Sequence, residues 1–135
     1  MAFQFSTSVR NAALDSIETT VGASAVLKLR TGAVPASVGT ADSGTVLATM
    51  NLPSDWLANA SSGSKALSGT WEDTSADASG DAGHFRIYAS DGTTAHIQGT
   101  VTATGGGGDM TLSSVTIASG QPVEITAFTL TAGGA

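Results

Sequence analysis

Two histidines on either side of a predicted turn are the residues best placed for metal chemistry. His84 and His96 are the only histidines of the chain, and the pair Asp91-Gly92 lies between them. If the flanking runs form a hairpin, the two imidazoles could face each other across the ladder and bind a metal ion with one carboxylate. Neither belongs to an HxH or HxxxH pair, so a polar cross-strand pair is the favoured interpretation.

An acidic segment at residues 72–83, EDTSADASGDAG, is a second candidate. Asp73, Asp77 and Asp81 recur every four residues, and carboxylate oxygens are the ligands that Ca²⁺ prefers. An EF-hand loop instead needs ligands at alternating positions, a central glycine and a terminal glutamate. A solvated loop is therefore favoured, and a cation site is the alternative.

No motif of covalent or phosphate chemistry accompanies these residues. The run TGGGGD at residues 104–109 precedes a predicted strand and lacks the Lys and Ser or Thr of a phosphate loop. The chain has no cysteine, no GxSxG motif and no Ser-His-Asp ordering. We therefore expect no catalytic, cofactor-binding or metal-binding residues, no small-molecule substrate and no enzymatic activity.

Composition excludes further classes of function. Charged residues make up 12% of the chain, about half of what soluble domains carry, and the net charge is −6. An acidic chain is poorly suited to nucleic acid, whose phosphates need Lys and Arg. No apolar run is long enough to span a bilayer, and no basic-then-apolar leader begins the sequence, so we expect cytoplasmic synthesis without a membrane partner. A surface of Ser, Thr, Ala and Gly has little charge to keep copies of a protein apart, which favours a protein that is part of an assembly.

The elements that would position these residues are mostly strands. The segment 83–103 alternates apolar and polar residues on both sides of Asp91-Gly92, which predicts a hairpin with Phe85, Ile87, Ile97 and Val101 in the core. Further strands are predicted at 23–30, 45–52, 65–72, 110–117 (broken at Ser113-Ser114) and 122–130. The spacing predicts a mainly β fold, an antiparallel β-sandwich or jelly-roll-like barrel with one short N-terminal helix.

That helix is predicted at residues 6–22. Ser6, Thr7 or Ser8 can cap it, and Gly22 follows its last apolar position. Val9, Ala13, Ile17 and Val21, with Leu14, form an apolar stripe. We expect this stripe to pack on the sheet of its own domain, with packing against a symmetry mate as the alternative. The predicted organisation is one domain, 1–135, with an arm at 1–5, the helix at 6–22 and the sandwich at 23–135.

Several residues are candidates for contact with other proteins. Phe3 and Phe5 lie two apart in the apolar arm, which is either an edge strand of its own domain or an arm that reaches a neighbour. Val34 and Pro35 lie in a predicted surface loop at 31–44. Trp56 lies in SDWLANA, a predicted single helical turn at 54–60, and is either a core residue, which is favoured, or an exposed interface residue.

Three stretches resemble small β-rich structural proteins of tailed bacteriophages: LKLRTG after the helix, GTVLATMNLPSDWL at residues 44–57, and the whole segment 83–135. The resemblance lies in the general run of the sequence over these stretches, and it includes no catalytic motif. It implies a virion component, most readily a capsid decoration (cement) protein that stabilises the head by bridging capsid subunits. The implied partners are the major capsid protein and copies of the chain itself, as a homotrimer on local three-fold axes. Alternatives are a tail or fibre component, or a carbohydrate-binding β-sandwich, which would display its aromatic residues.

Overall fold

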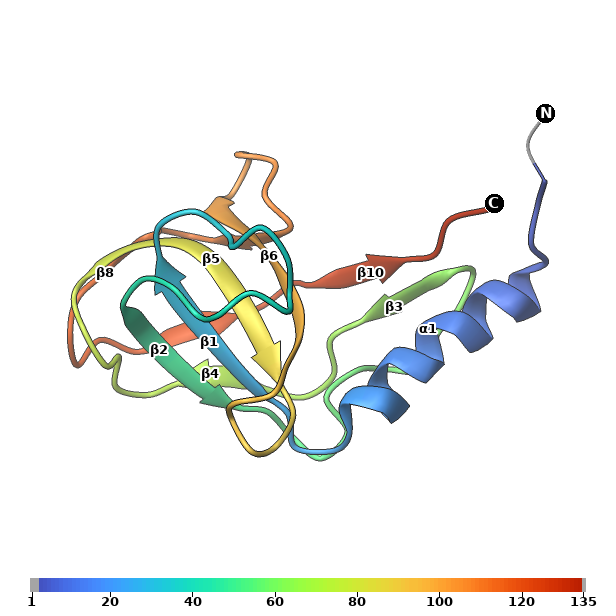
Figure 1. Cartoon of the computed structure of the whole chain (residues 1–135), viewed down its shortest axis with the longest axis horizontal. Helices are drawn as coiled ribbons and strands as arrows, with labels where there is room; N and C mark the ends of the chain where they lie inside the picture. Colours follow the sequence, from blue (N-terminus) through green and yellow to red (C-terminus); the bar gives the residue numbers. More distant parts are fainter. Residues whose placement is uncertain (1–2, 135) are drawn as a thin grey trace.

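The computed structural model describes residues 3–134 and has a β-rich body from which a helix and a two-stranded ribbon project to one side (Figure 1). The fold is mainly β with a single N-terminal helix, as predicted. The elements are α1 (Thr7–Val21), β1 (Val26–Thr31), β2 (Val46–Asn51), β3 (Ser64–Ala66), β4 (Trp71–Asp73), β5 (Gly80–Tyr88), β6 (Ala95–Ala103), β7 (Met110–Leu112), β8 (Thr116–Ile117), β9 (Val123–Ile125) and β10 (Thr129–Thr131).

The main sheet is built around the predicted hairpin. Its strand order is β2-β1-β5-β6-β7, with β8 also paired to β5, and it curls into a half-barrel. Within the β5–β6 hairpin, Ile87 pairs with Ile97, and the Asp91 carboxylate accepts hydrogen bonds from the backbone N–H groups of Thr93 and Thr94. The turn is therefore longer than the Asp-Gly pair alone.

One strand pair departs from the predicted antiparallel pairing and makes the sheet mixed. β6 and β7 run parallel, and the glycine-rich run 104–109 turns the chain back between them. The Asp109 carboxylate accepts hydrogen bonds from the backbone N–H and the hydroxyl of Thr100, at 3.0 and 3.1 Å. This contact holds the returning chain beside the strand that it has just left.

The helix begins and ends at its predicted caps. Ser6 accepts a hydrogen bond from the backbone N–H of Val9 through its side chain, and Gly22 has a φ of 97°. That left-handed conformation is costly for residues with a Cβ, so glycine ends the helix here.

Two predicted strands are each divided between the body and the projecting ribbon. The run 65–72 splits into β3 and β4, and the run 122–130 splits into β9 and β10. Gly69, with a φ of 73°, makes the first break, which alternation of apolar residues does not reveal. β4 pairs with β9 in the body, whereas β3 pairs with β10 in the ribbon. We call α1 together with the β3–β10 ribbon the stem.

The core lies inside the curled sheet and is closed by aromatic residues. Trp71 packs against both Trp56 and Phe128, with ring centroids 5.9 and 5.6 Å apart, and Phe128 packs edge-on against Phe85. Among the predicted core residues, Phe85, Ile87 and Val101 are buried and Ile97 is half-buried.

Trp56 is fully buried, so its alternative assignment as an interface residue is wrong. Its indole N–H donates to the carbonyl oxygen of Gly22, at 2.9 Å. Residues 54–60 form no helical turn. Instead, Leu57 makes a β-bridge with Leu67, because the segment must run extended to bring both apolar side chains into the core.

A long loop covers the outer face of the main sheet, which explains why side chains on both faces of β1 are buried. Residues 32–45 cross over β1 and β5 and are held by Asp42. The Asp42 carboxylate binds Arg30 at 3.0 Å and Arg86 at 2.8 Å, and accepts a hydrogen bond from the Tyr88 hydroxyl at 2.8 Å. Both arginines are buried, so the loop supplies the charge that they need.

Acid should weaken this attachment. Although burial raises the pKa of Asp42, the Tyr88 hydrogen bond and the charges of Arg30 and Arg86 outweigh it and hold the pKa below its ordinary value of 3.8. A carboxyl whose pKa falls on folding stabilises the fold above its unfolded pKa. That contribution is lost as the pH falls through the lower, folded pKa.

We predict that Asp42→Asn lowers the free energy of unfolding at pH 7 by roughly 2 kcal/mol, because two buried guanidinium groups lose their anion. Urea denaturation between pH 2 and 7 measures this, and the difference between wild type and variant should shrink toward pH 2. Asp55→Asn, an exposed carboxyl, is the matched control and should behave as wild type. Equal unfolding curves for Asp42→Asn and wild type at pH 7 would contradict the assignment.

Candidate functional site

The helix of the stem is attached to the rest of the chain by its polar face. Side-chain oxygens of Asn11, Asp15 and Glu18 accept hydrogen bonds from backbone N–H groups of Gly63, Ala60 and Leu57, at 2.9, 2.9 and 3.1 Å. These three side chains lie at helical spacing on one side of α1. They satisfy backbone donors of the irregular segment 57–63, which has few strand partners of its own.

A buried lysine completes this attachment. Lys65 of β3 is 1% exposed, and its ammonium group binds Asp15 at 2.7 Å, Glu18 at 3.2 Å and the carbonyl oxygen of Ala58 at 3.0 Å. Burial lowers the pKa of Lys65, but its hydrogen bonds to Asp15 and Glu18 more than offset this and raise the pKa above its ordinary value. The hydrogen bond from Lys65, with that from Ala60, lowers the pKa of Asp15. The lysine therefore stays charged over the physiological range.

Because the polar side faces inward, much of the apolar stripe of α1 stays open. Leu14 and Val21 are buried, but Val9 is 49% exposed, Ala13 is exposed and Ile17 is half-buried. The expectation that the whole stripe packs on its own sheet is therefore wrong. The reason is that hydrogen bonds to the polar side fix the rotation of the helix.

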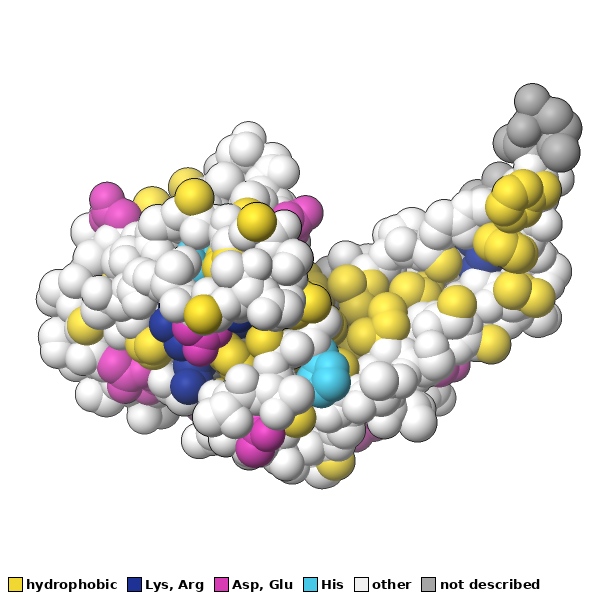
Figure 2. All heavy atoms as spheres, viewed as in Figure 1, with side chains coloured by type: hydrophobic (Ala, Val, Ile, Leu, Met, Phe, Trp, Pro, Cys, Tyr) yellow, Lys and Arg dark blue, Asp and Glu magenta, His cyan; other side chains and the backbone are white. Residues whose placement is uncertain are grey.

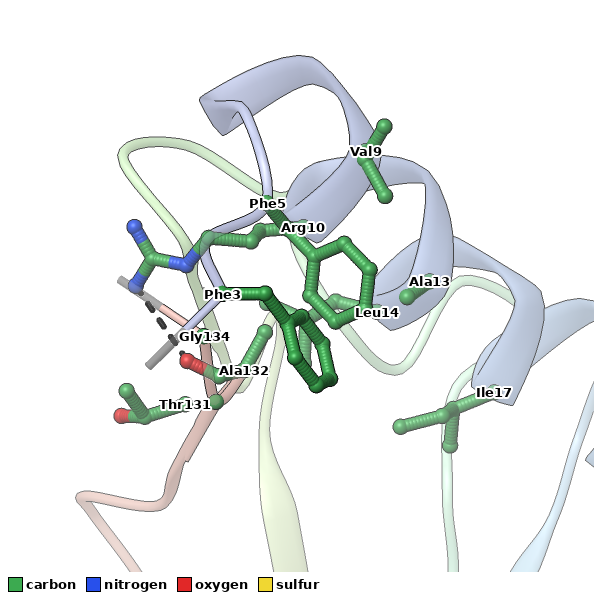
Figure 3. Close-up of a pocket in the computed structure, with 11 residues that line it drawn as sticks. Phe3, Phe5, Val9, Arg10, Ala13, Leu14, Ile17, Thr131, Ala132 and Gly134 are labelled. Atoms are coloured by element: carbon green, nitrogen blue, oxygen red, sulfur yellow. Dashed lines mark hydrogen bonds between the residues drawn. The ribbon is translucent and has the colours of Figure 1, made fainter. Parts of the chain in front are cut away.

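The open stripe forms one wall of an apolar groove (Figures 2 and 3). The largest hollow, about 770 Å³, lies between α1 and the chain after β10. Two smaller hollows, of about 340 and 240 Å³, continue it along β10 toward β6. We call this surface the stem groove. Its walls include Val9, Ala13, Ile17, Leu130 and Ile97, with Phe3 and Phe5 at its outer end.

One long side of the stem groove is the edge of a strand. β10 pairs with β3 along one edge, and within residues 3–134 no strand pairs with its other edge. In this antiparallel register Phe128 and Ala132 bond to the β3 side, so the backbone groups of Thr129 and Thr131 point to the opposite side. An open strand edge beside an apolar wall is suited to binding an extended segment.

The N-terminal arm is the most exposed apolar part of the described chain. Phe3 is 70% exposed and Phe5 is 48% exposed, and their rings meet edge to face at a centroid distance of 5.4 Å. The backbone N–H of Phe5 donates to the carbonyl oxygen of Gly134, at 2.7 Å. Met1 and Ala2, also part of the predicted arm, lie outside the described residues.

The two loop candidates contribute less than the arm. Val34 and Pro35 are half-buried, and the carbonyl oxygen of Pro35 accepts a hydrogen bond from Gln98 of β6, so this part of the loop is held against the body. Val38 of the same loop is 39% exposed and was not among the predicted residues.

The two histidines do not come together, so the favoured expectation of a cross-strand pair is wrong, and the alternative metal site is not formed by them either. His84 pairs with Thr100 rather than with His96, so the two imidazoles do not face each other. His84 is buried and bonds through Nδ1 to the carbonyl oxygen of Gly32, whereas His96 is exposed. Across residues 3–134, no three His, Cys, Asp or Glu side chains are grouped closely enough to hold a metal ion.

Two carboxylates of the acidic segment at residues 72–83 hold it to β2. Asp73 accepts a hydrogen bond from the backbone N–H of Thr49, and Asp77 accepts one from the Thr49 hydroxyl, at 2.9 and 2.7 Å. Both carboxylates thus fasten the segment to the edge of β2. Asp81 lies in β5, so the segment is not one continuous loop.

The exposure of aromatic side chains bears on the alternative of a carbohydrate-binding β-sandwich, which would display such residues. Trp56, Trp71 and Tyr88 are all fully buried, and none presents a face on which a sugar could stack. Phe3 and Phe5 are the exposed aromatic side chains of the described chain, and both lie at the stem groove.

Comparison with protein-family models, with curated proteins and with solved structures finds no match for this chain. Among the described residues, no helix has the length and apolar character needed to cross a membrane.

Sequence reasoning found the arm but missed the groove. A signal was present: Asn11, Asp15 and Glu18 form a polar stripe as regular as the apolar one. What the sequence did not show is that backbone donors at 57–63 and the single buried Lys65 would bind that polar stripe.

We predict that Lys65→Met releases the helix while the body stays folded. The change leaves Asp15 and Glu18 without their cation, so we expect the free energy of local unfolding of α1 to fall by roughly 2–3 kcal/mol. The loss is limited because both carboxylates keep their hydrogen bonds from backbone N–H groups. Hydrogen exchange should show faster exchange of the α1 amides, with β5 and β6 unchanged. Lys28→Met, at a lysine bound to the carbonyl oxygen of Gly92, is the control. Unchanged α1 protection in Lys65→Met would show that the ion pairs do not hold the helix.

Proposed function

We propose that this protein is a structural component of the virion of a tailed bacteriophage, most specifically a capsid decoration protein. In this role it makes no bond and breaks none; it adds buried contact area across the seams between capsid subunits. The observation that carries the proposal is the open apolar stem, whose exposed phenyl rings and helix face need a partner surface.

Three features support this role. The sequence of residues 44–57 and 83–135 resembles that of such phage proteins. The low charge of the chain favours permanent contact with other proteins over free diffusion. The stem extends to one side of the body (Figure 1), which gives a single copy the reach to touch more than one neighbour.

The division of labour follows from the shape. The stem offers apolar area, and the exposed part of the 32–45 loop with Val38 offers a second contact on the body. A standard protein contact buries about 1,600 Å² in total, and many copies on one shell act together, so modest affinity at each site suffices. The acidic balance of the chain would meet basic patches on the shell and would speed encounter more than it strengthens binding.

The first test is direct. Virions of the phage that encodes this chain, purified and analysed by mass spectrometry, should contain the protein in many copies per particle. Its absence from purified particles would contradict a virion role, and its presence only in isolated tails would assign it to the tail instead of the capsid.

The second test addresses the arm. We predict that Phe3→Ser with Phe5→Ser leaves the domain folded, since both rings are exposed, but lowers retention on capsids by about tenfold or more, because two phenyl rings lose apolar contact area. Co-sedimentation of the protein with capsids stripped of it measures retention. Gln4→Ser, between the two rings, is the matched control. Full retention of the double variant would show that the arm takes no part in the contact.

A further inference from the structure

The stem groove and the arm lie on the same part of one chain, and each offers what the other needs. We propose that the stem groove binds a second copy of this chain, whose N-terminal arm adds to the open edge of β10 and places Phe3 and Phe5 against the α1 wall. This inference deepens the proposed function, since it names the surface through which copies associate. Its test in solution is separate from any capsid assay.

The groove is too long for the arm of its own chain. Residues 3–5 span only about 10 Å when extended, whereas residues 129–134 beside the groove span about 20 Å. The arm joins α1 at the outer end of the groove, so its rings cover only that end (Figure 3). The remainder, along Ile17, Leu130 and Ile97, stays open for another chain.

The size of the surface fits a stable contact. Of the 22 residues that line the three hollows of the stem groove, Leu14, Val21, Phe85 and Phe128 are buried, which leaves 18 at the surface. A standard interface uses about 20–30 residues from each partner, so the groove supplies most of one. Figure 2 shows hydrophobic side chains gathered along the concave side between the body and the projecting stem, with polar surface between them.

The two larger hollows of the groove carry no carboxylate and one guanidinium, that of Arg10, which donates to the carbonyl oxygen of Ala132 at 3.2 Å. Two copies that each carry a net charge of −6 repel unless they meet at a face without acids. No Asp or Glu lines the two larger hollows, because Asp15 and Glu18 point inward to Lys65. In the third hollow, Asp109 is bound to Thr100. The stem is therefore a face on which two acidic copies can meet without facing carboxylates.

The matching apolar surface is on the stem itself. Of the four large hydrophobic side chains exposed in residues 3–134, Phe3, Phe5 and Val9 lie at the stem groove and only Val38 lies elsewhere. A surface that carries both the groove and the side chains to fill it is self-complementary, which is what a symmetric contact between identical chains requires.

The backbone supports strand addition. The arm reads Phe-Gln-Phe, so in an extended conformation both rings face one side and Gln4 faces the other. The Phe5 N–H donates to the carbonyl oxygen of Gly134, so the arm makes one backbone hydrogen bond with the chain that continues β10. In the complex, the arm of the second copy would make backbone hydrogen bonds of the same kind to Thr129 and Thr131 of the first.

The experiment compares two valine substitutions that add the same charge. Val9→Glu places a carboxylate in the stem groove, whereas Val38→Glu places one on the far loop; the two valines are 49% and 39% exposed. Sedimentation equilibrium and native mass spectrometry of the full chain should show that the wild type is an oligomer. We expect Val9→Glu to raise the dissociation constant about 100-fold or more, and Val38→Glu to change it less than threefold.

A second measurement locates the contact. Hydrogen exchange at two protein concentrations should show that the amides of Thr129 and Thr131 become protected as the oligomer forms, and that Val9→Glu removes this protection. Circular dichroism confirms that the variants fold. If Val9→Glu lowers the melting temperature, Phe3→Ser, at a 70% exposed ring, takes its place and should dissociate the oligomer in the same way.

Three results would overturn the proposal: a wild-type monomer up to millimolar concentration, equal effects of Val9→Glu and Val38→Glu, or an oligomer whose Thr129 and Thr131 amides exchange as in the monomer. A monomer whose retention on capsids is nevertheless lost in Val9→Glu would assign the groove to the shell protein and not to a second copy.

Discussion

The arrangement of the stem depends on one buried cation. Lys65 binds two carboxylates of α1 and a backbone carbonyl, and the penalty for burying its ammonium group is offset only while both carboxylates face it. This fixes the rotation of the helix about its axis. Because Asp15 and Glu18 must point inward, Val9 and Ala13 on the opposite side must point outward. The exposed apolar wall is thus a consequence of an ion pair rather than of any preference of the apolar side chains themselves.

The same use of charge appears in the body. Arg30 and Arg86 are buried and bind the partly exposed Asp42, and together with Lys65 they are three of the five basic residues of the chain. Each buried pair joins segments far apart in sequence: the 32–45 loop to the main sheet, and α1 to β3. These positive charges therefore hold parts of the fold together, and only Arg10 and Lys28 among the basic residues are partly exposed.

Local patterns predicted a large part of the fold correctly. The β5–β6 hairpin, the helix caps, the break at Ser113-Ser114 and the loop over residues 31–44 follow from alternation, turn residues and capping, which act over a few neighbouring positions. Errors occurred where an apolar alternation continues through a change of sheet. The runs 65–72 and 122–130 look like single strands, yet each is divided between the ribbon and the body. The first run passes from β3 to β4 through a turn at Gly69, and the second passes from β9 to β10 through Phe128, whose ring packs beside Trp71 in the aromatic core. The parallel pairing of β6 and β7 could not be predicted either, since the direction in which two strands pair is not a local property of the sequence.

By itself the sequence determined that this is an acidic, mainly β chain with one capped helix, an apolar arm and no recognisable catalytic motif. Those properties depend on composition and on spacing within short segments. Only the tertiary structure decided which side of the helix faces inward, that the open edge of β10 runs beside the apolar wall, and that Trp56 is buried while Phe3 and Phe5 are exposed. A helix with two equally regular stripes can dock by either one. The choice was made by Lys65 and by the backbone donors of residues 57–63, which are distant in sequence and need the carboxylates of α1 once they are withdrawn from water.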